Sequence, residues 1–152
     1  VVFSPKSLLR HPGVASPLQE FTSGTFKEVI DDASVKAKEV NRVILCNGKI
    51  YYDLLEAQAK RKTKDTAVVR LEQLYPFPEK QLNAVLKKYK DAKLVWAQEE
   101  PANMGAQSFI LRMMPKHDIE YVSRKASASP ATGYTKVHKV EQEKLVNKAF
   151  EI

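Results

Sequence analysis

The stretch VILCNGKIYYDLLEAQAKR, from Val43 to Arg61, most limits what this chain can fold into. It begins with four consecutive apolar residues, and a run without polar alternation suits a strand that is covered on both faces, as in a parallel sheet. The breaker pair Asn47-Gly48 follows, and apolar residues then recur at three- and four-residue steps, the period of a helix face. The stretch therefore predicts a strand, a turn and a helix. One such unit needs sister units to bury its apolar surface.

The rest of the chain supplies these units. Strands are predicted at 66–71, 93–97 and 119–122, and helices at about 78–89, 104–114 and 137–150. Strand and helix thus alternate four times along the chain. This alternation is typical of an α/β layered fold with a largely parallel sheet. Right-handed crossovers would place helices on both faces of that sheet.

Three expectations concern single positions within these elements. Trp96, in the strand at 93–97, is expected to be buried in the core. Asn103 can cap the helix that begins at Met104. The last helix is expected to turn five apolar residues inward: Val137, Val140, Leu145, Val146 and Ala149.

The first forty residues lack this regularity, because His11-Pro12-Gly13 and Pro17 interrupt any helical turn. The polar stretch 31–39 predicts a mobile surface loop. We therefore expect a single domain, in which an irregular entry segment over 1–40 packs on an α/β domain over 41–152. The chain also begins VVFSPKS, on an apolar strand-like run without an initiator methionine, so we expect a fragment of a longer polypeptide.

Length and composition exclude several classes of protein. At 152 residues the chain fits one domain with a sizeable core. No apolar run approaches the length of a membrane span, and no stretch has the layout of a signal peptide. The single cysteine, Cys46, allows no intrachain disulfide, and a reducing, cytoplasmic setting fits this usage. The net charge of +7 is spread over helix faces without interleaved aromatics, which favours solvated surface over a nucleic-acid-binding face.

Motifs for catalysis and for metal or cofactor binding are missing from the sequence. There is no phosphate loop, no dinucleotide fingerprint, no nucleophilic serine elbow and no Cys/His pair. The three histidines are far apart and lack the spacing of metal ligands, so structural or surface roles are favoured for them. We therefore assign no catalytic, cofactor-binding or metal-binding residue.

Three other features stand out. Glu99-Glu100 lie at the carboxyl end of a predicted strand, where open α/β sheets place ligands. This pair of carboxylates could transfer protons, but hydrogen bonding to nearby backbone N–H groups or to a partner surface is the favoured role. Arg124-Lys125 adjoin the small, polar SASPATG loop, which suits either a phosphate or carboxylate ligand or packing against another domain. Gln73, Lys80 and Gln81 lie where a strand ends and a helix begins, a place that favours anions, although exposed polar residues are common there.

Six segments together resemble a known family. In chain order they are FSPKSLLRH, NGKIYYDL, RLEQLYPFP, WAQEEPANMGA, SRKASASPATG and VHKVEQEKLV. They look like the C-terminal domain of the 2-oxoglutarate dehydrogenase E1 component, and more loosely like the third domain of transketolase-like thiamine diphosphate enzymes. The resemblance implies a three-layer sandwich whose sheet is mostly parallel with one antiparallel edge strand.

The resemblance also implies a parent enzyme of the tricarboxylic acid cycle that decarboxylates 2-oxoglutarate on thiamine diphosphate and passes the succinyl group to a lipoyl carrier. In that family the diphosphate, the magnesium ion and the aminopyrimidine are held by the two preceding domains. This chain is then a non-catalytic domain that supports the E1 dimer, without a cofactor of its own. Its partners would be the other E1 domains, the second E1 subunit and the E2 succinyltransferase, with no nucleic acid or membrane. The expected interface residues are Glu99, Glu100, Asn103, Ser129 and Thr132.

The alternative function is an effector module for a nucleotide or acetyl-CoA, with Gln73, Lys80, Gln81 and Arg124 as the anion-binding residues. Some actinobacterial members of the family bind acetyl-CoA as an activator. Among the positions that match their effector site, only Gln73 is shared. Thr25 stands where those members have a Lys, and Glu28 stands where they have a Ser. Lys80 replaces an Arg, and Gln81 replaces a positively charged residue. Because Lys lacks the bidentate fork of Arg, these departures argue against activation by acetyl-CoA.

Overall fold

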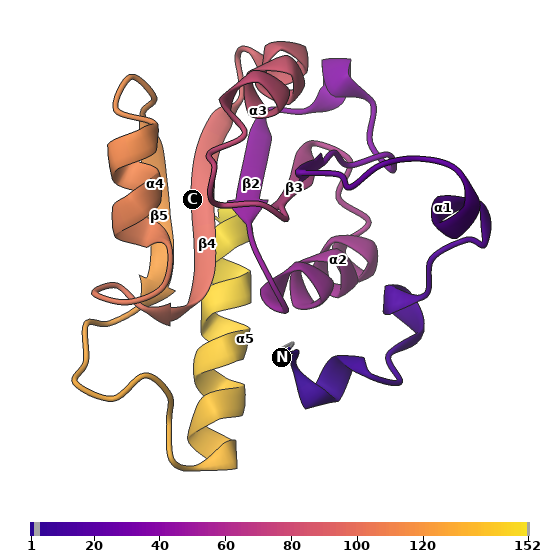
Figure 1. Ribbon diagram of the computed structural model, residues 1–152. Coiled ribbons are helices and arrows are strands. Elements are labelled where there is room, and N and C mark those ends of the chain that lie inside the picture. The colour runs from indigo at the N-terminus through magenta and orange to yellow at the C-terminus, as the bar shows by residue number, and fades with distance from the viewer. Residues whose placement is uncertain (2–3, 152) are drawn as a thin grey trace.

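Strand β2 (Arg42–Cys46) is the middle strand of a five-stranded sheet in the computed structural model, which describes residues 1 and 4–151 (Figure 1). The other strands are β1 (Val29–Ile30), β3 (Thr66–Leu71), β4 (Lys93–Pro101) and β5 (Ile119–Arg124). The strand order is β1-β3-β2-β4-β5. Strands β2 to β5 pair in parallel, and β1 pairs antiparallel with β3 at one edge. The predicted α/β class and the antiparallel edge strand are confirmed.

Helices cover both faces of the sheet and complete the three layers (Figure 1). The α-helices are α1 (Gln19–Thr22), α2 (Ile50–Arg61), α3 (Glu79–Leu86), α4 (Gln107–Met113) and α5 (Thr135–Glu151). Short 3₁₀ turns are η1 (Lys6–Leu8), η2 (Pro12–Val14), η3 (Ala37–Glu39) and η4 (Lys87–Tyr89). Helices α2 and α5 pack on one face, and α3, η4 and α4 pack on the other.

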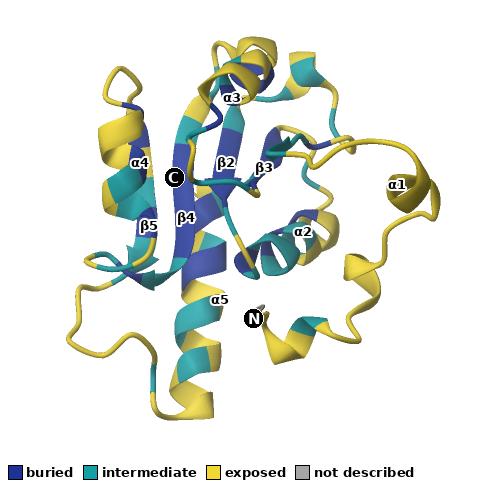
Figure 2. Cartoon of the chain, viewed as in Figure 1, coloured by how far each residue is buried: buried dark blue, intermediate teal, exposed yellow. Residues whose placement is uncertain are grey.

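The apolar run in β2 explains why both faces need cover. Val43 and Leu45 point toward α3 and α4, while Ile44 and Cys46 point toward α2 and α5, and all four are fully buried. The buried residues follow the strands through the centre of the molecule (Figure 2). Alternation of side chains on a strand thus divides one apolar run between two cores.

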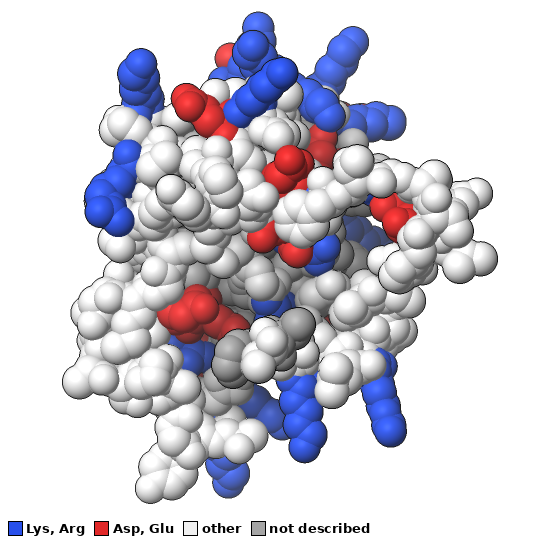
Figure 3. Space-filling view, in the orientation of Figure 1, with Lys and Arg blue, Asp and Glu red and all other residues white. Residues whose placement is uncertain are grey.

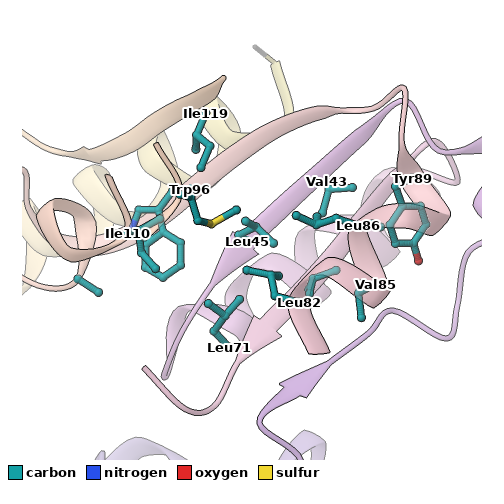
Figure 4. Close-up of a cluster of buried hydrophobic side chains, with 14 residues drawn as sticks. Val43, Leu45, Leu71, Leu82, Val85, Leu86, Tyr89, Trp96, Ile110 and Ile119 are labelled. Carbon is teal, nitrogen blue, oxygen red and sulfur yellow. The ribbon is translucent and has the colours of Figure 1, made fainter. Parts of the chain in front are cut away.

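Trp96 lies in the core on the α3 and α4 side, as predicted, and none of its surface is exposed (Figure 4). Its indole Nε1 donates a hydrogen bond of 3.0 Å to the side-chain oxygen of Gln98, two residues later in β4. The large ring therefore fills space in the core without leaving its polar atom unpaired.

Helix α5 departs from one prediction. Leu145, Val146 and Ala149 are buried, but Val137 and Val140 are 45% and 51% exposed. The first turns of α5 extend past the carboxyl edge of the sheet, so no strand lies beneath them (Figure 2). Helical spacing alone does not reveal how long the sheet beneath a helix is, and the prediction was wrong for these two valines.

The polar segment 31–39 is anchored at one residue, Asp32, which is buried. The Asp32 carboxylate accepts hydrogen bonds from the Val68 backbone N–H at 3.0 Å and from Gln58 Nε2 at 2.7 Å. A carboxylate paired in this way ties the segment to β3 and α2. Before this segment the chain is mostly exposed and contains η1, η2 and α1. The apolar run at 1–3 includes two residues outside the described part.

We expect Trp96→Ala to lower the free energy of unfolding by about 3–5 kcal/mol, because the truncation leaves a cavity in a closed core. Urea unfolding followed by circular dichroism measures this loss. Val137→Ala is the matched control on an exposed apolar position, where we expect a change within about 0.5 kcal/mol. A Trp96 variant as stable as this control would contradict the assigned core.

Candidate functional site

The carboxyl edge of the sheet is the place where this fold would bind a ligand. From β2 the chain turns to α2 on one face, and from β4 it turns to α4 on the other. Open α/β sheets bind ligands in the crevice at such a switch point. Here Lys49, which follows β2, meets Glu99 in β4, with Nζ 2.6 Å from Oε2. The carboxyl ends of these two strands are therefore joined by an ion pair of the chain itself.

This ion pair is shielded from solvent more than an ordinary surface pair. The side chains of Lys49 and Glu99 are only 25% and 24% exposed. Asp53, in the first turn of α2, adds a second carboxylate at 3.9 Å from Lys49 Nζ. Partly buried charges are screened little by salt. The two carboxylates therefore stay close to one cation, which holds the start of α2 against the end of β4.

Gln142, in α5, joins four elements at this edge. Its Nε2 donates to Asp53 Oδ2 at 2.8 Å and to Glu99 Oε2 at 3.3 Å. Its Oε1 accepts a hydrogen bond of 3.2 Å from Arg124 Nη2, at the end of β5. One amide thus links α2, β4, β5 and α5 through its donor and acceptor sides.

Arg124 braces α5 from the end of β5. Its Nη2 lies 2.8 Å from His138 Nδ1. A guanidinium only donates, so His138 accepts at Nδ1 and carries its proton on Nε2. The Arg124 side chain is only 10% exposed, and Glu141 Oε2 lies 3.5 Å from its Nε. At least part of the Arg124 guanidinium is therefore bound by side chains of this domain.

Arg70, at the end of β3, is also paired internally. Its guanidinium lies 4.4 Å from the ring centroid of Tyr51, donates to Tyr52 Oη at 2.9 Å, and its Nε is 2.7 Å from Glu72 Oε1. Stacking of this kind suits the planar guanidinium of arginine.

The buried Cys46 thiol is a poor nucleophile, because burial raises its pKa far above the usual value and keeps it protonated.

Gln98 organises the segment QEEPANMG. Its side chain is fully buried, and its Nε2 donates to the carbonyl oxygens of Pro101 and Met104 at 3.1 and 2.8 Å. Its Oε1 accepts from the Gln107 backbone N–H at 2.9 Å as well as from Trp96. The β4–β5 register shifts between Ala97 and Pro101, and this amide satisfies backbone groups that the shift would leave unpaired.

A reciprocal pair of hydrogen bonds joins this segment to the SASPATG loop. Asn103 Nδ2 donates to the Ser127 carbonyl oxygen, and the Ser127 N–H donates to Asn103 Oδ1, both at 3.0 Å. The prediction that Asn103 caps α4 was wrong, since Ala106 is the N-cap residue and no side chain caps it. The asparagine side chain instead holds together two loops that are 24 residues apart in sequence.

The predicted anion-binding residues do not form one group. Arg124 ends β5, whereas Gln73 follows β3, and strands β2 and β4 lie between them. Gln73 Nε2 donates to the Pro76 carbonyl oxygen at 2.7 Å, and Gln81 Nε2 donates to Glu28 Oε1 at 3.1 Å. Lys80 is exposed. The negative charge of Glu28 therefore faces the corner where an anion was expected.

The predicted interface residues lie closer together, on the two linked loops and the end of β4. Glu99 belongs to the switch-point ion pair, and Glu100 is half-buried beside it in sequence. Ser129 is exposed, and its Oγ donates to the Ala131 carbonyl oxygen at 2.8 Å. Thr132 Oγ1 is buried without a hydrogen-bond partner among the described residues.

Sequence reasoning missed Lys49, Gln98 and Gln142. Lys49 had a usable signal, since it follows a buried strand at the turn where ligands or charges gather. No such signal marked the other two residues, because Gln98 lies in an apolar strand and Gln142 lies on a helix of mixed polarity. Their partners are set by how distant elements pack.

The described residues contain no group of three or more His, Cys, Asp or Glu side chains that could hold a metal ion. Within residues 1 and 4–151, no helix has the length and apolar character needed to cross a membrane. Lys and Arg side chains project from both ends of the molecule in Figure 3 and do not gather into one patch on that face.

With this geometry in place, comparison with known proteins decides the family. The family model described as 2-oxoglutarate dehydrogenase C-terminal matches residues 15–150. The chain belongs to this family. The resemblance in the six segments is thereby confirmed.

Individual relatives agree with this assignment. An oxoglutarate dehydrogenase of Buchnera aphidicola subsp. Baizongia pistaciae is 47% identical, over 100% of this chain and 17% of the relative. A 2-oxoglutarate dehydrogenase E1 component of Cupriavidus necator is 46% identical, over 99% of this chain and 16% of the relative. A protein of Caenorhabditis elegans named 2-oxoglutarate dehydrogenase, mitochondrial, is 43% identical, again over 99% and 16%. The chain thus spans only 16–17% of the length of these curated relatives.

Gly105 tests the role of Gln98. Its φ is +65°, and a Cβ there would lie 3.1 Å from both polar atoms of the Gln98 amide. We expect Gly105→Ala to cost about 1–2 kcal/mol from the left-handed backbone alone, and more from the displaced amide. The measurement is urea unfolding. Gly48→Ala is the matched control, since its φ is +68° and its Cβ would meet nothing within 4 Å, and equal stability of the two variants would argue against the Gln98 assignment.

Proposed function

We propose that this chain is the non-catalytic C-terminal scaffold domain of a 2-oxoglutarate dehydrogenase E1 component. The parent enzyme would decarboxylate 2-oxoglutarate on thiamine diphosphate and pass the succinyl group to the lipoyl carrier of an E2 succinyltransferase in the tricarboxylic acid cycle. Membership of the C-terminal family supports the placement. The observation that carries the scaffold role is the Lys49–Glu99 ion pair, which joins the residues that follow β2 to the end of β4 with side chains of the domain itself.

The neighbouring charges support the same role. At the carboxyl ends of β3 and β5, Arg70 and Arg124 bind side chains of this chain. Catalytic groups act on a substrate only when geometry leaves them free to reach it. Groups that are tied to each other in this way fix the relative positions of helices and strands, which is what a scaffold requires.

The residues present do not fit thiamine diphosphate with its magnesium ion. A magnesium site needs several oxygen ligands around one point. The carboxylates at the crevice, Asp53 and Glu99, instead share the Lys49 ammonium and the Gln142 amide. This supports placing the cofactor on other domains of the parent chain, and no step of the reaction is assigned to the residues of this one.

The proposed contact surface consists of the linked loops around Asn103 and Ser129, with Glu100 and Thr132. The Asn103–Ser127 bonds hold these loops in one arrangement. Loops of small residues that are fixed from within suit contact with another domain or with the second E1 subunit.

A cytoplasmic location remains a prediction, since the relatives include bacterial proteins and a nematode protein named mitochondrial.

The alternative role as an effector module for a nucleotide or acetyl-CoA has less support at the corner of Gln73, Lys80 and Gln81. Glu28 lies within hydrogen-bonding distance of Gln81 and would repel an anion there. Lys80 offers one mobile ammonium without the fork of an arginine. The scaffold role is therefore preferred.

We expect the isolated chain to release no carbon dioxide from 2-oxoglutarate when thiamine diphosphate and magnesium are added. The reason is that its strand-end carboxylates are held by Lys49 and Gln142. Manometry or a coupled assay for carbon dioxide measures this, with the full-length enzyme as the positive control. Turnover by the isolated chain would refute the scaffold role.

We expect Ser129→Trp in the full-length enzyme to shift the dimer toward monomer, because the bulky ring would separate the proposed contact surface from its partner. Sedimentation velocity measures the shift. Lys116→Trp, at an exposed position near the amino end of β5, is the matched control and should leave the dimer intact. Both variants should melt like the unmodified chain when made as isolated domains. An unaffected dimer in both would remove Ser129 from the interface.

A further inference from the structure

A hollow lies between the SASPATG loop and α5. It has a volume of about 510 Å³, and its lining includes Arg124, Lys125, Thr132, Glu141, Lys144 and Lys148. This hollow is called the loop pocket below. The loop leaves the end of β5, extends beyond the sheet and returns at the start of α5 (Figure 1).

The charge of the loop pocket is strongly positive. Four cationic side chains face one carboxylate, that of Glu141. Lys144 and Lys148 are four residues apart on one face of α5, a spacing at which like charges destabilise a helix. Glu141 is directed to Arg124, and neither lysine has a carboxylate within 4 Å among the described residues. An anion between these groups would relieve the repulsion.

Two polar atoms in the wall of the loop pocket make no hydrogen bond among the described residues. Arg124 is nine-tenths buried, and its Nε has only the Glu141 carboxylate, at 3.5 Å, without a hydrogen bond among the described residues. Thr132 Oγ1 is also buried without a partner. Buried polar atoms are nearly always hydrogen-bonded, so each unpaired one calls for an explanation. A ligand with several acceptor oxygens would satisfy both the guanidinium and the hydroxyl.

We propose that the loop pocket binds the phosphate group of a small soluble metabolite. Phosphate offers several acceptors and up to two negative charges, which match a guanidinium, a hydroxyl and two ammonium groups. The volume exceeds that of a bare phosphate and lies within the range of small-molecule sites. No aromatic side chain lines the pocket, and base stacking, on which single-stranded nucleic acids depend, has no platform there.

This site is separate from the predicted corner at Gln73, Lys80 and Gln81. It includes Arg124 and the SASPATG loop, where the sequence predicted either an anion or packing against another domain, and it adds residues of α5 that sequence reasoning did not select. Ser129 and Thr132 line the loop pocket and also belong to the proposed contact surface, so the pocket lies on the α5 side of the same loop. The bound phosphate would fix the loop from its inner side, while the Asn103–Ser127 bonds hold it at its start.

The test is hydrogen–deuterium exchange with calorimetry on the full-length enzyme. The probes are inorganic phosphate, ribose 5-phosphate and, as a carboxylate of similar charge, succinate. We expect the two phosphates to slow exchange of the amides in residues 123–133, with tighter binding of ribose 5-phosphate if the metabolite body also contacts the pocket. Succinate binding as tight as phosphate binding would overturn the phosphate assignment.

Paired variants locate the site. Lys144→Gln with Lys148→Gln should weaken phosphate binding by about tenfold or more, since two charge-assisted contacts are lost. Lys136→Gln with Lys139→Gln removes the same charge from exposed positions of α5 outside the pocket and should leave binding unchanged. Equal loss in both pairs would reduce the effect to net charge and overturn the proposal. Full protection of the amides in residues 123–133 from exchange without any ligand would also overturn the proposal, because the pocket would then be closed.

Discussion

The burial of β2 on both faces is the constraint on which the rest of this molecule depends. Four consecutive apolar side chains alternate between two cores, so helices must cover both sides of the strand. Parallel neighbours then need crossover connections, and α2, α3 and α4 supply them. The carboxyl ends of the strands meet at one edge as a consequence, and there the chain gathers its charged residues.

At that edge this domain departs from the usual behaviour of open α/β sheets. The crevice between β2 and β4 would normally receive a ligand, but Lys49 and Glu99 meet in it. Gln142 and Arg124 extend the contact to α5. The fold thus keeps the geometry of a binding site while its polar groups are used to hold four elements together. The scaffold role that we propose is consistent with this arrangement.

The strands, the helices and the layering were predictable because each depends on a local period and on breakers such as Asn47-Gly48. The family could be predicted from six short segments. Exposure of Val137 and Val140 could not, because it depends on where the sheet ends beneath α5. The partners of Gln98 and Gln142 were equally out of reach, since their hydrogen bonds join elements far apart in sequence. Asn103 illustrates the same limit: a good helix cap in sequence became a link between two loops.

The lone cysteine has a practical meaning for this fold. Cys46 lies at the end of the central strand, fully buried in the core formed with α2 and α5, and burial raises the pKa of its thiol. The thiol can lose its proton to solvent and meet an alkylating reagent only when the helices on that face separate. The rate of labelling therefore reports directly on the opening of one layer, from a probe that the natural sequence already carries.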